Sequence, residues 1–134
     1  MATGSANTQN YRNALTVKAF KQFNFDAAHQ LPDWPGIHGH SYVAEVWFEG
    51  PATDGYVVPE SVLTQQLESI RRTLDHSNLN DLMEMPTSEN IARFIWKALS
   101  DCDALIKVRV LRGSIGFGVE YTQEDARREG LASS

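Results

Sequence analysis

Cysteine is nearly absent from this chain of 134 residues, because Cys102 is the only one. A single thiol excludes an internal disulfide framework and is typical of a reducing compartment, so we expect a cytoplasmic location. The chain has no run of eighteen apolar residues, and we expect no membrane span. Residues 1–13 are polar and lack an apolar segment, which indicates a disordered tail rather than a secretory signal.

Positive charge is also scarce. Twelve lysines and arginines stand against 17 acidic residues, the net charge is -5, and the basic residues are scattered along the sequence. This balance argues against a nucleic-acid partner. With 42% hydrophobic residues and no repeat or linker, the chain is expected to form one domain over residues 14–123. Residues 124–134 are expected to form a short helix or a frayed tail.

Histidine is rare but concentrated, since three of the four histidines lie within twelve residues: His29, His38 and His40. Histidine is the commonest metal ligand, and three neutral imidazoles leave a tetrahedral zinc with one open position, as catalysis requires. An isolated His-x-His pair on a strand is often only structural, so the prediction depends on whether the three rings converge.

Alternation of apolar and polar residues predicts strands over residues 16–29 and 38–49. Side chains two apart on a strand share a face, so His38 and His40 lie side by side. A turn containing Pro32, Pro35 and Gly36 is expected to fold the two strands into a hairpin. This hairpin would place His29 opposite the other two histidines.

The remaining pattern predicts two helices and two further strands. Leucine and isoleucine recur at helical spacing over residues 60–74, and residues 75–81 are polar and turn-like. Thr87 or Ser88 can cap a second helix that runs to about residue 100. Strands are expected over 105–111 and 118–122. The order β-β-α-α-β-β predicts an α+β domain, an antiparallel sheet with helices on one face and two edges open to pairing between subunits.

Four short motifs follow one another along the chain, and their order and spacing carry a family resemblance. They are Phe25-Asp-Ala-Ala-His29, His38-Gly-His-Ser-Tyr42, Leu74-Asp-His-Ser-Asn-Leu-Asn80 and Pro86-Thr-Ser-Glu-Asn-Ile-Ala92. Over residues 16–122 the chain resembles the 6-pyruvoyl-tetrahydropterin synthase and 6-carboxytetrahydropterin synthase family. The resemblance implies the tunnelling fold (T-fold), in which the β-β-α-α-β-β units join their sheets into a trimeric barrel. Two such trimers usually stack as a hexamer.

The resemblance also implies roles for individual residues. His29, His38 and His40 would bind zinc, which in the family holds the side-chain hydroxyls of dihydroneopterin triphosphate. Asp75 and His76 match the family's proton-transfer pair, in which the carboxylate orients the ring. From the residues alone, the C-terminal cap of a helix is the favoured interpretation of the same pair.

Three positions depart from the family pattern. Trp34 stands where the family has its reactive cysteine, and tryptophan cannot exchange a proton. Arg112 stands at the glutamate that anchors the pterin ring, and arginine only donates hydrogen bonds. A small misalignment, with Glu120 as the true acid, is the alternative. Pro59-Glu60 replaces the family's Asp-Phe and suits a simple helix start.

The leading hypothesis from the sequence is a zinc-dependent lyase or cyclase repurposed for a non-pterin, oxygenated substrate. Arg112 would recognise an acidic group, and Thr87 and Ser88 would line the pocket. Asp33 is a candidate replacement acid or base, and Trp34 a candidate apolar wall, although both can be ordinary loop residues. The alternatives are an ordinary pterin synthase acting on dihydroneopterin triphosphate and a zinc-containing binding subunit without catalysis.

Overall fold

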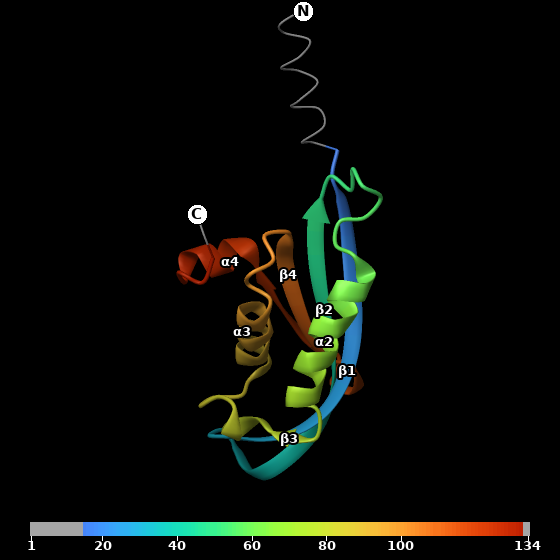
Figure 1. Ribbon diagram of the computed structural model, residues 1–134. Helices are drawn as coiled ribbons and strands as arrows, with labels where there is room; N and C mark the ends of the chain where they lie inside the picture. The colour runs from blue at the N-terminus through green and yellow to red at the C-terminus, as the bar shows by residue number, and fades with distance from the viewer. Residues whose placement is uncertain (1–14, 133–134) are drawn as a thin grey trace, which may run out of the picture.

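The computed structural model describes residues 15–132, so the predicted tail at residues 1–13 lies outside the described residues (Figure 1). Two long strands open the fold, two helices follow, and a second pair of strands and a short helix close it. The strands are β1 (Val17–Leu31), β2 (Trp34–Gly50), β3 (Ser77–Asn78), β4 (Leu105–Arg112) and β5 (Phe117–Thr122). The helices are α2 (Glu60–Leu74), η1 (Leu79–Asp81), α3 (Ser88–Ala98), η2 (Gly113–Ile115) and α4 (Gln123–Arg128).

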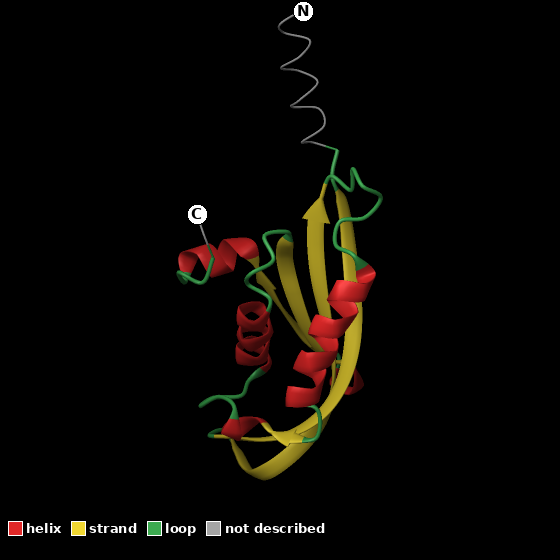
Figure 2. Cartoon of the chain, in the orientation of Figure 1, coloured by secondary structure: helices red, strands yellow, loops and turns green. Residues whose placement is uncertain are grey.

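The strands form one sheet in the order β3-β1-β2-β4-β5. The four long strands pair antiparallel, and β3 adds a two-residue parallel pairing to β1. Helices α2 and α3 cover one face of this sheet (Figure 2). The architecture confirms the predicted α+β fold, and it leaves most of β1 and all of β5 as sheet edges.

The core lies between the sheet and the two helices, on the face that alternation predicts. Every second residue of β1 from Phe23 to His29 is buried, and so is every second residue of β2 from Tyr42 to Phe48. Helix α2 meets this face with Leu63, Leu67, Ile70 and Leu74. Burying each such side chain stabilises the fold by about 1.5–3 kcal/mol.

The predicted turn between the first two strands was too long. Only Pro32 and Asp33 lie outside the strands, and both Pro35 and Gly36 belong to β2. The register shifts between His29 and Leu31, and Gly36 has a φ of +81°. Proline is tolerated in a strand where the ladder is irregular, because no N–H is required there. The local turn signals were therefore overridden by a tighter, irregular hairpin.

Three further segments refine the sequence interpretation. The polar stretch after α2 is not a simple turn, since β3 pairs with β1 and η1 follows it. Pro59 is the N-terminal cap residue of α2, as expected of a helix start. After residue 122 the chain forms α4, whose first turn is closed by a reciprocal capping box between Thr122 and Asp125. Among residues 15–132, the helices are all too short or too polar to cross a membrane.

Candidate metal centre

Three imidazole rings converge at the end of the β1–β2 hairpin. His29 pairs directly with His38 across the two strands, and His40 follows two residues later on the same face. The ring centroids lie 4.5 Å apart for His29 and His38, 5.0 Å for His29 and His40, and 4.9 Å for His38 and His40. One nitrogen from each ring lies within 4.8 Å of the others. Three imidazole nitrogens gathered this closely could together hold one zinc ion.

The main chain before α3 holds the most buried of the three rings. His29 Nδ1 donates to the carbonyl oxygen of Pro86 at 2.7 Å, and the side chain is almost fully buried. This bond fixes the ring orientation and leaves Nε2 as the atom that could bind a metal, an arrangement found in known metal sites. His29 Nε2 lies 2.9 Å from His38 Nε2. Sequence reasoning missed Pro86, because a backbone carbonyl carries no residue-type signal.

Two of the three histidines, His29 and His40, have lowered pKa values, which favours the neutral form that metal binding requires. Burial, with the charge of Arg112 beside it, lowers the pKa of His40 to about 4. Burial also lowers the pKa of His29, although the bond to Pro86 acts in the opposite direction. Three imidazoles on one face of the hairpin are a donor set that zinc accepts, so the residues present suit this metal.

Arg112, at the end of β4, belongs to the same group of side chains. Its Nη1 donates to His40 Nε2 at 3.0 Å, and its guanidinium lies 5.1 Å from the centre of the Phe117 ring. Glu120, the alternative to Arg112 in the alignment, pairs instead with Arg109 at 3.3 Å. Arg109 alternates with the buried residues Val108 and Val110, so this ion pair lies on the opposite face of the sheet. The geometry thus places an arginine, not a glutamate, beside the histidines.

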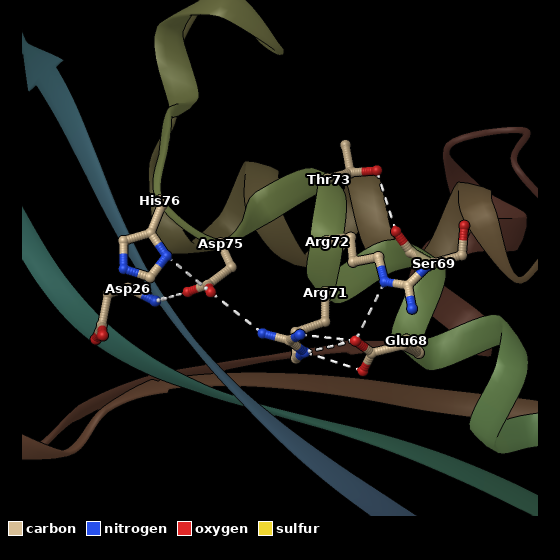
Figure 3. A network of polar contacts seen from close by, with 8 residues as sticks. All are labelled: Asp26, Glu68, Ser69, Arg71, Arg72, Thr73, Asp75 and His76. Carbon is tan, nitrogen blue, oxygen red and sulfur yellow. Dashed lines mark hydrogen bonds and ion pairs between the residues drawn. The ribbon is translucent and has the colours of Figure 1, made fainter.

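Asp75 and His76 form a second polar group at the exposed edge of β1 (Figure 3). Asp75 Oδ1 accepts from the backbone N–H of Asp26 at 2.9 Å. Its Oδ2 accepts from His76 Nδ1 at 2.9 Å and from Arg71 Nη1 at 3.2 Å. The Asp26 N–H, then His76 and Arg71, lower the pKa of the Asp75 carboxyl. Asp75 is also the C-terminal cap residue of α2, which confirms the structural interpretation of this motif. Its role in proton transfer stays a prediction.

Asp75 fixes the ring of His76 through Nδ1, and the rest of the ring is exposed. Its side chain is 82% exposed, and its backbone lies in the left-handed region with a φ of +58°. That conformation is uncommon outside glycine, and the backbone N–H of His76 holds it by donating to the carbonyl of Asp26 at 2.6 Å. An open depression of about 440 Å³ is lined by both His40 and His76, together with Asp26, Ala28, Gly39 and Ser41.

The other residues singled out from the sequence lie around this centre without joining it. Asp33 is exposed in the two-residue turn, and its charge only weakly opposes the lowering of the His29 pKa that burial causes. Trp34 is 60% exposed, with its ring 5.8 Å from that of His38. Thr87 accepts from the backbone N–H of Asn90 and caps α3, while Ser88 is buried. Their predicted contacts with substrate stay predictions.

Comparisons with known proteins identify the family of this chain. A family model described as 6-pyruvoyl tetrahydropterin synthase matches residues 18–124. A dihydroneopterin monophosphate aldolase of Pyrococcus furiosus is 42% identical over 83 residues, which cover 60% of this chain and 73% of that protein. A 6-carboxy-5,6,7,8-tetrahydropterin synthase of Synechocystis is 38% identical over 95 residues, covering 61% and 74%.

Solved structures support the same fold. The structure of Caenorhabditis elegans 6-pyruvoyl tetrahydropterin synthase superposes with a TM-score of 0.70 and 23% identity, covering 80% of this chain and 95% of that one. The family match spans most of the sequence, including all three clustered histidines and the Asp-His pair. The chain is therefore a member of the 6-pyruvoyl tetrahydropterin synthase family, whose named relatives are enzymes of pterin metabolism.

Proposed function

We propose that this protein is a zinc-dependent lyase that cleaves a carbon–carbon bond in the hydroxylated side chain of a phosphorylated dihydropterin. The observation that carries the proposal is the cluster of three histidines with the guanidinium of Arg112 beside it. This arrangement offers a metal for hydroxyl oxygens and a cation for a phosphate in the same place. The dihydroneopterin monophosphate aldolase from Pyrococcus, at 42% identity, supports the same reaction class.

His29, His38 and His40 would hold the metal, and the carbonyl of Pro86 would keep His29 in place. A bound zinc ion supplies a Lewis acid that polarises a substrate hydroxyl and makes its proton easier to remove. Since three protein ligands leave a fourth position open, the substrate has room to bind the metal.

The Asp75–His76 pair would move the proton. In a retro-aldol cleavage, a base takes the proton of a hydroxyl whose carbon becomes an aldehyde. The bond to the neighbouring carbon breaks, its electron pair passes to the ring imine, and that carbon then receives a proton. His76 can carry this proton on Nε2, because Asp75 already fixes Nδ1.

The absence of the family's reactive cysteine favours carbon–carbon cleavage over the ordinary pterin-synthase reaction on dihydroneopterin triphosphate. Trp34 offers no ionisable group at that position, and the side chain is largely exposed. His76 lines the same open depression as His40, and it is the group to which we assign the proton transfer. Asp33 and Trp34 would then border the entrance, and Thr87 and Ser88 would act chiefly by positioning α3 and Pro86.

A second candidate function is the action of this scaffold on a non-pterin, acidic metabolite. Arg112 favours it, because a guanidinium cannot accept the hydrogen bonds that the donors of a pterin ring would make. A buried site without an acceptor would discriminate strongly against such a ring. The two candidates share the metal and the Asp-His pair and differ only in substrate.

We also propose that the protein assembles as a homotrimer or homohexamer. Most of β1 and all of β5 are sheet edges, and an unpaired edge is a ready template for a strand of another subunit. Measuring the mass of the purified protein in solution tests this directly.

The test of function is incubation of zinc-loaded protein with dihydroneopterin monophosphate and, separately, dihydroneopterin triphosphate, with products identified by mass. We expect an aldehyde fragment and a shortened pterin, no turnover by His76→Ala with zinc retained, and no zinc in His38→Ala. Release of inorganic triphosphate would instead indicate an ordinary pterin synthase. Zinc bound without any pterin product would favour the non-pterin candidate, and unchanged turnover by His76→Ala would refute the proposed proton transfer.

A further inference from the structure

One hydrogen bond beside the metal centre is at odds with metal binding. Arg112 Nη1 donates to His40 Nε2 at 3.0 Å, and so occupies the lone pair that this ring would offer to zinc. The nitrogen has a single lone pair, so it cannot serve the guanidinium and a metal at once. Binding of a metal to all three histidines therefore requires Arg112 to leave His40.

Arg112 forms no ion pair with any carboxylate of residues 15–132. The ion pairs of arginine and lysine among these residues all involve other side chains, so no carboxylate neutralises the charge of Arg112. Besides the bond to His40, its guanidinium lies 5.1 Å from the centre of the Phe117 ring. A buried or half-buried cation without an anionic partner is costly, and it favours an anion supplied from solution.

Unsatisfied polar atoms mark the same place independently. Four buried side-chain nitrogen or oxygen atoms of the described residues have no hydrogen-bond partner: His38 Nδ1, Tyr42 Oη, Arg112 Nε and Trp96 Nε1. The first three belong to the metal centre or to residues next to it. Because buried polar groups are nearly always paired, this concentration indicates a site completed by a bound polar ligand.

We propose that Arg112 couples metal binding to anion binding. In the metal-free protein it occupies His40 and lowers the affinity for zinc. Metal binding releases it, and the freed guanidinium then binds a phosphate or carboxylate that offsets its repulsion with the metal. Zinc and an anionic ligand consequently bind with positive cooperativity, each raising the affinity for the other by the same factor. This inference rests on the proposed function only in requiring that the three histidines bind a metal.

The experiment measures zinc affinity directly, without reference to turnover. Protein stripped of metal competes for zinc against a coloured chelator, in chloride and in inorganic phosphate at equal ionic strength. Wild type is compared with Arg112→Met, which is similar in length but neutral, and with Arg112→Lys, which keeps the charge without the planar fork. Arg72→Met removes an equal charge from an arginine of α2 that is 76% exposed and serves as the matched control.

We expect Arg112→Met to bind zinc about tenfold more tightly than wild type in chloride, since a competing hydrogen bond to a charged group is lost. Phosphate should tighten zinc binding by wild type several-fold and leave Arg112→Met unchanged. Arg112→Lys should lie between them, and Arg72→Met should match wild type. Equal or weaker zinc affinity in Arg112→Met, or a phosphate effect that survives in it, would overturn the coupling.

Two further measurements separate this inference from the proposed function. Circular dichroism and the mass in solution establish that each variant is folded and assembled as wild type. If wild type binds one zinc that His38→Ala loses, but Arg112 has no influence, the coupling alone is wrong. If neither wild type nor Arg112→Met binds zinc, both the metal-dependent function and the coupling are refuted.

Discussion

His29 has two roles that a pair of substitutions can separate, because it supports the fold as well as facing the metal site. Its side chain is 2% exposed, and its Nδ1 donates to the carbonyl of Pro86 at 2.7 Å. His38 is only half-buried, and its Nδ1 has no protein partner. We therefore expect His29→Ala to destabilise the metal-free protein far more than His38→Ala, although both variants lose a metal ligand.

The magnitude follows from the contacts of each ring. His29→Ala leaves the buried carbonyl of Pro86 unpaired, which costs about 1–3 kcal/mol. Removing the ring also leaves a cavity of roughly 60 Å³, which at about 24 cal/mol per Å³ adds about 1.5 kcal/mol. The free energy of unfolding should fall by about 3 kcal/mol. For His38→Ala, a fall of about 1 kcal/mol or less is expected, as is typical of a partly exposed side chain.

Urea unfolding in the presence of a chelator, at one protein concentration, measures both values. With a slope of about 1.5 kcal/mol per molar urea, the midpoint should move by about 2 M for His29→Ala and by about 0.7 M or less for His38→Ala. His29→Gln is the control, since its amide can still donate to Pro86 and should recover part of the loss. Equal midpoints for the two alanine variants would refute the structural role assigned to the Pro86 bond.

Three more predictions follow from single contacts. Because the pKa of His40 is lowered to about 4 in the folded state, wild type should lose stability as the pH falls from about 6.5 to 4, and His40→Phe should flatten this part of a stability profile measured by urea unfolding. Tyr121→Phe removes a short bond from the Tyr121 hydroxyl to Glu129 and should lower the free energy of unfolding by about 1–2 kcal/mol in the same assay. Trp34→Cys, at a side chain that is 60% exposed, should change stability by less than about 1 kcal/mol and leave the zinc content measured by metal analysis intact.

The strands and the buried face could be predicted from the sequence because alternation depends only on the neighbouring residues. Phe25, Tyr42 and the other apolar positions of β1 and β2 all lie on the face that the pattern indicated. The prediction of a long hairpin turn was wrong because Pro35 and Gly36 are strong turn signals in isolation. Pairing with β1 keeps both residues in β2, and no local pattern reveals how far a ladder will extend.

The candidate site could be predicted only where side-chain type carries the information. The three histidines predict a candidate metal site, and the strand register brings His29, His38 and His40 together as expected. The resemblance to the family identified Arg112 as unusual, but not that it would bind His40. Pro86 and the backbone of Asp26 act through peptide groups, which every residue possesses. Their contribution appears only when the chain is folded.

The strand lengths explain why the candidate chemistry gathers at one end of the sheet. β1 and β2 have 15 and 17 residues, whereas β4 and β5 have 8 and 6. One face of β2 therefore passes from the apolar core at Phe48, Val46 and Ala44 through Tyr42 to His40 and His38 without a change of register. A slip of one residue would turn both the core and the metal ligands to the other face. The packing that stabilises the sheet thus also fixes the position of the histidines.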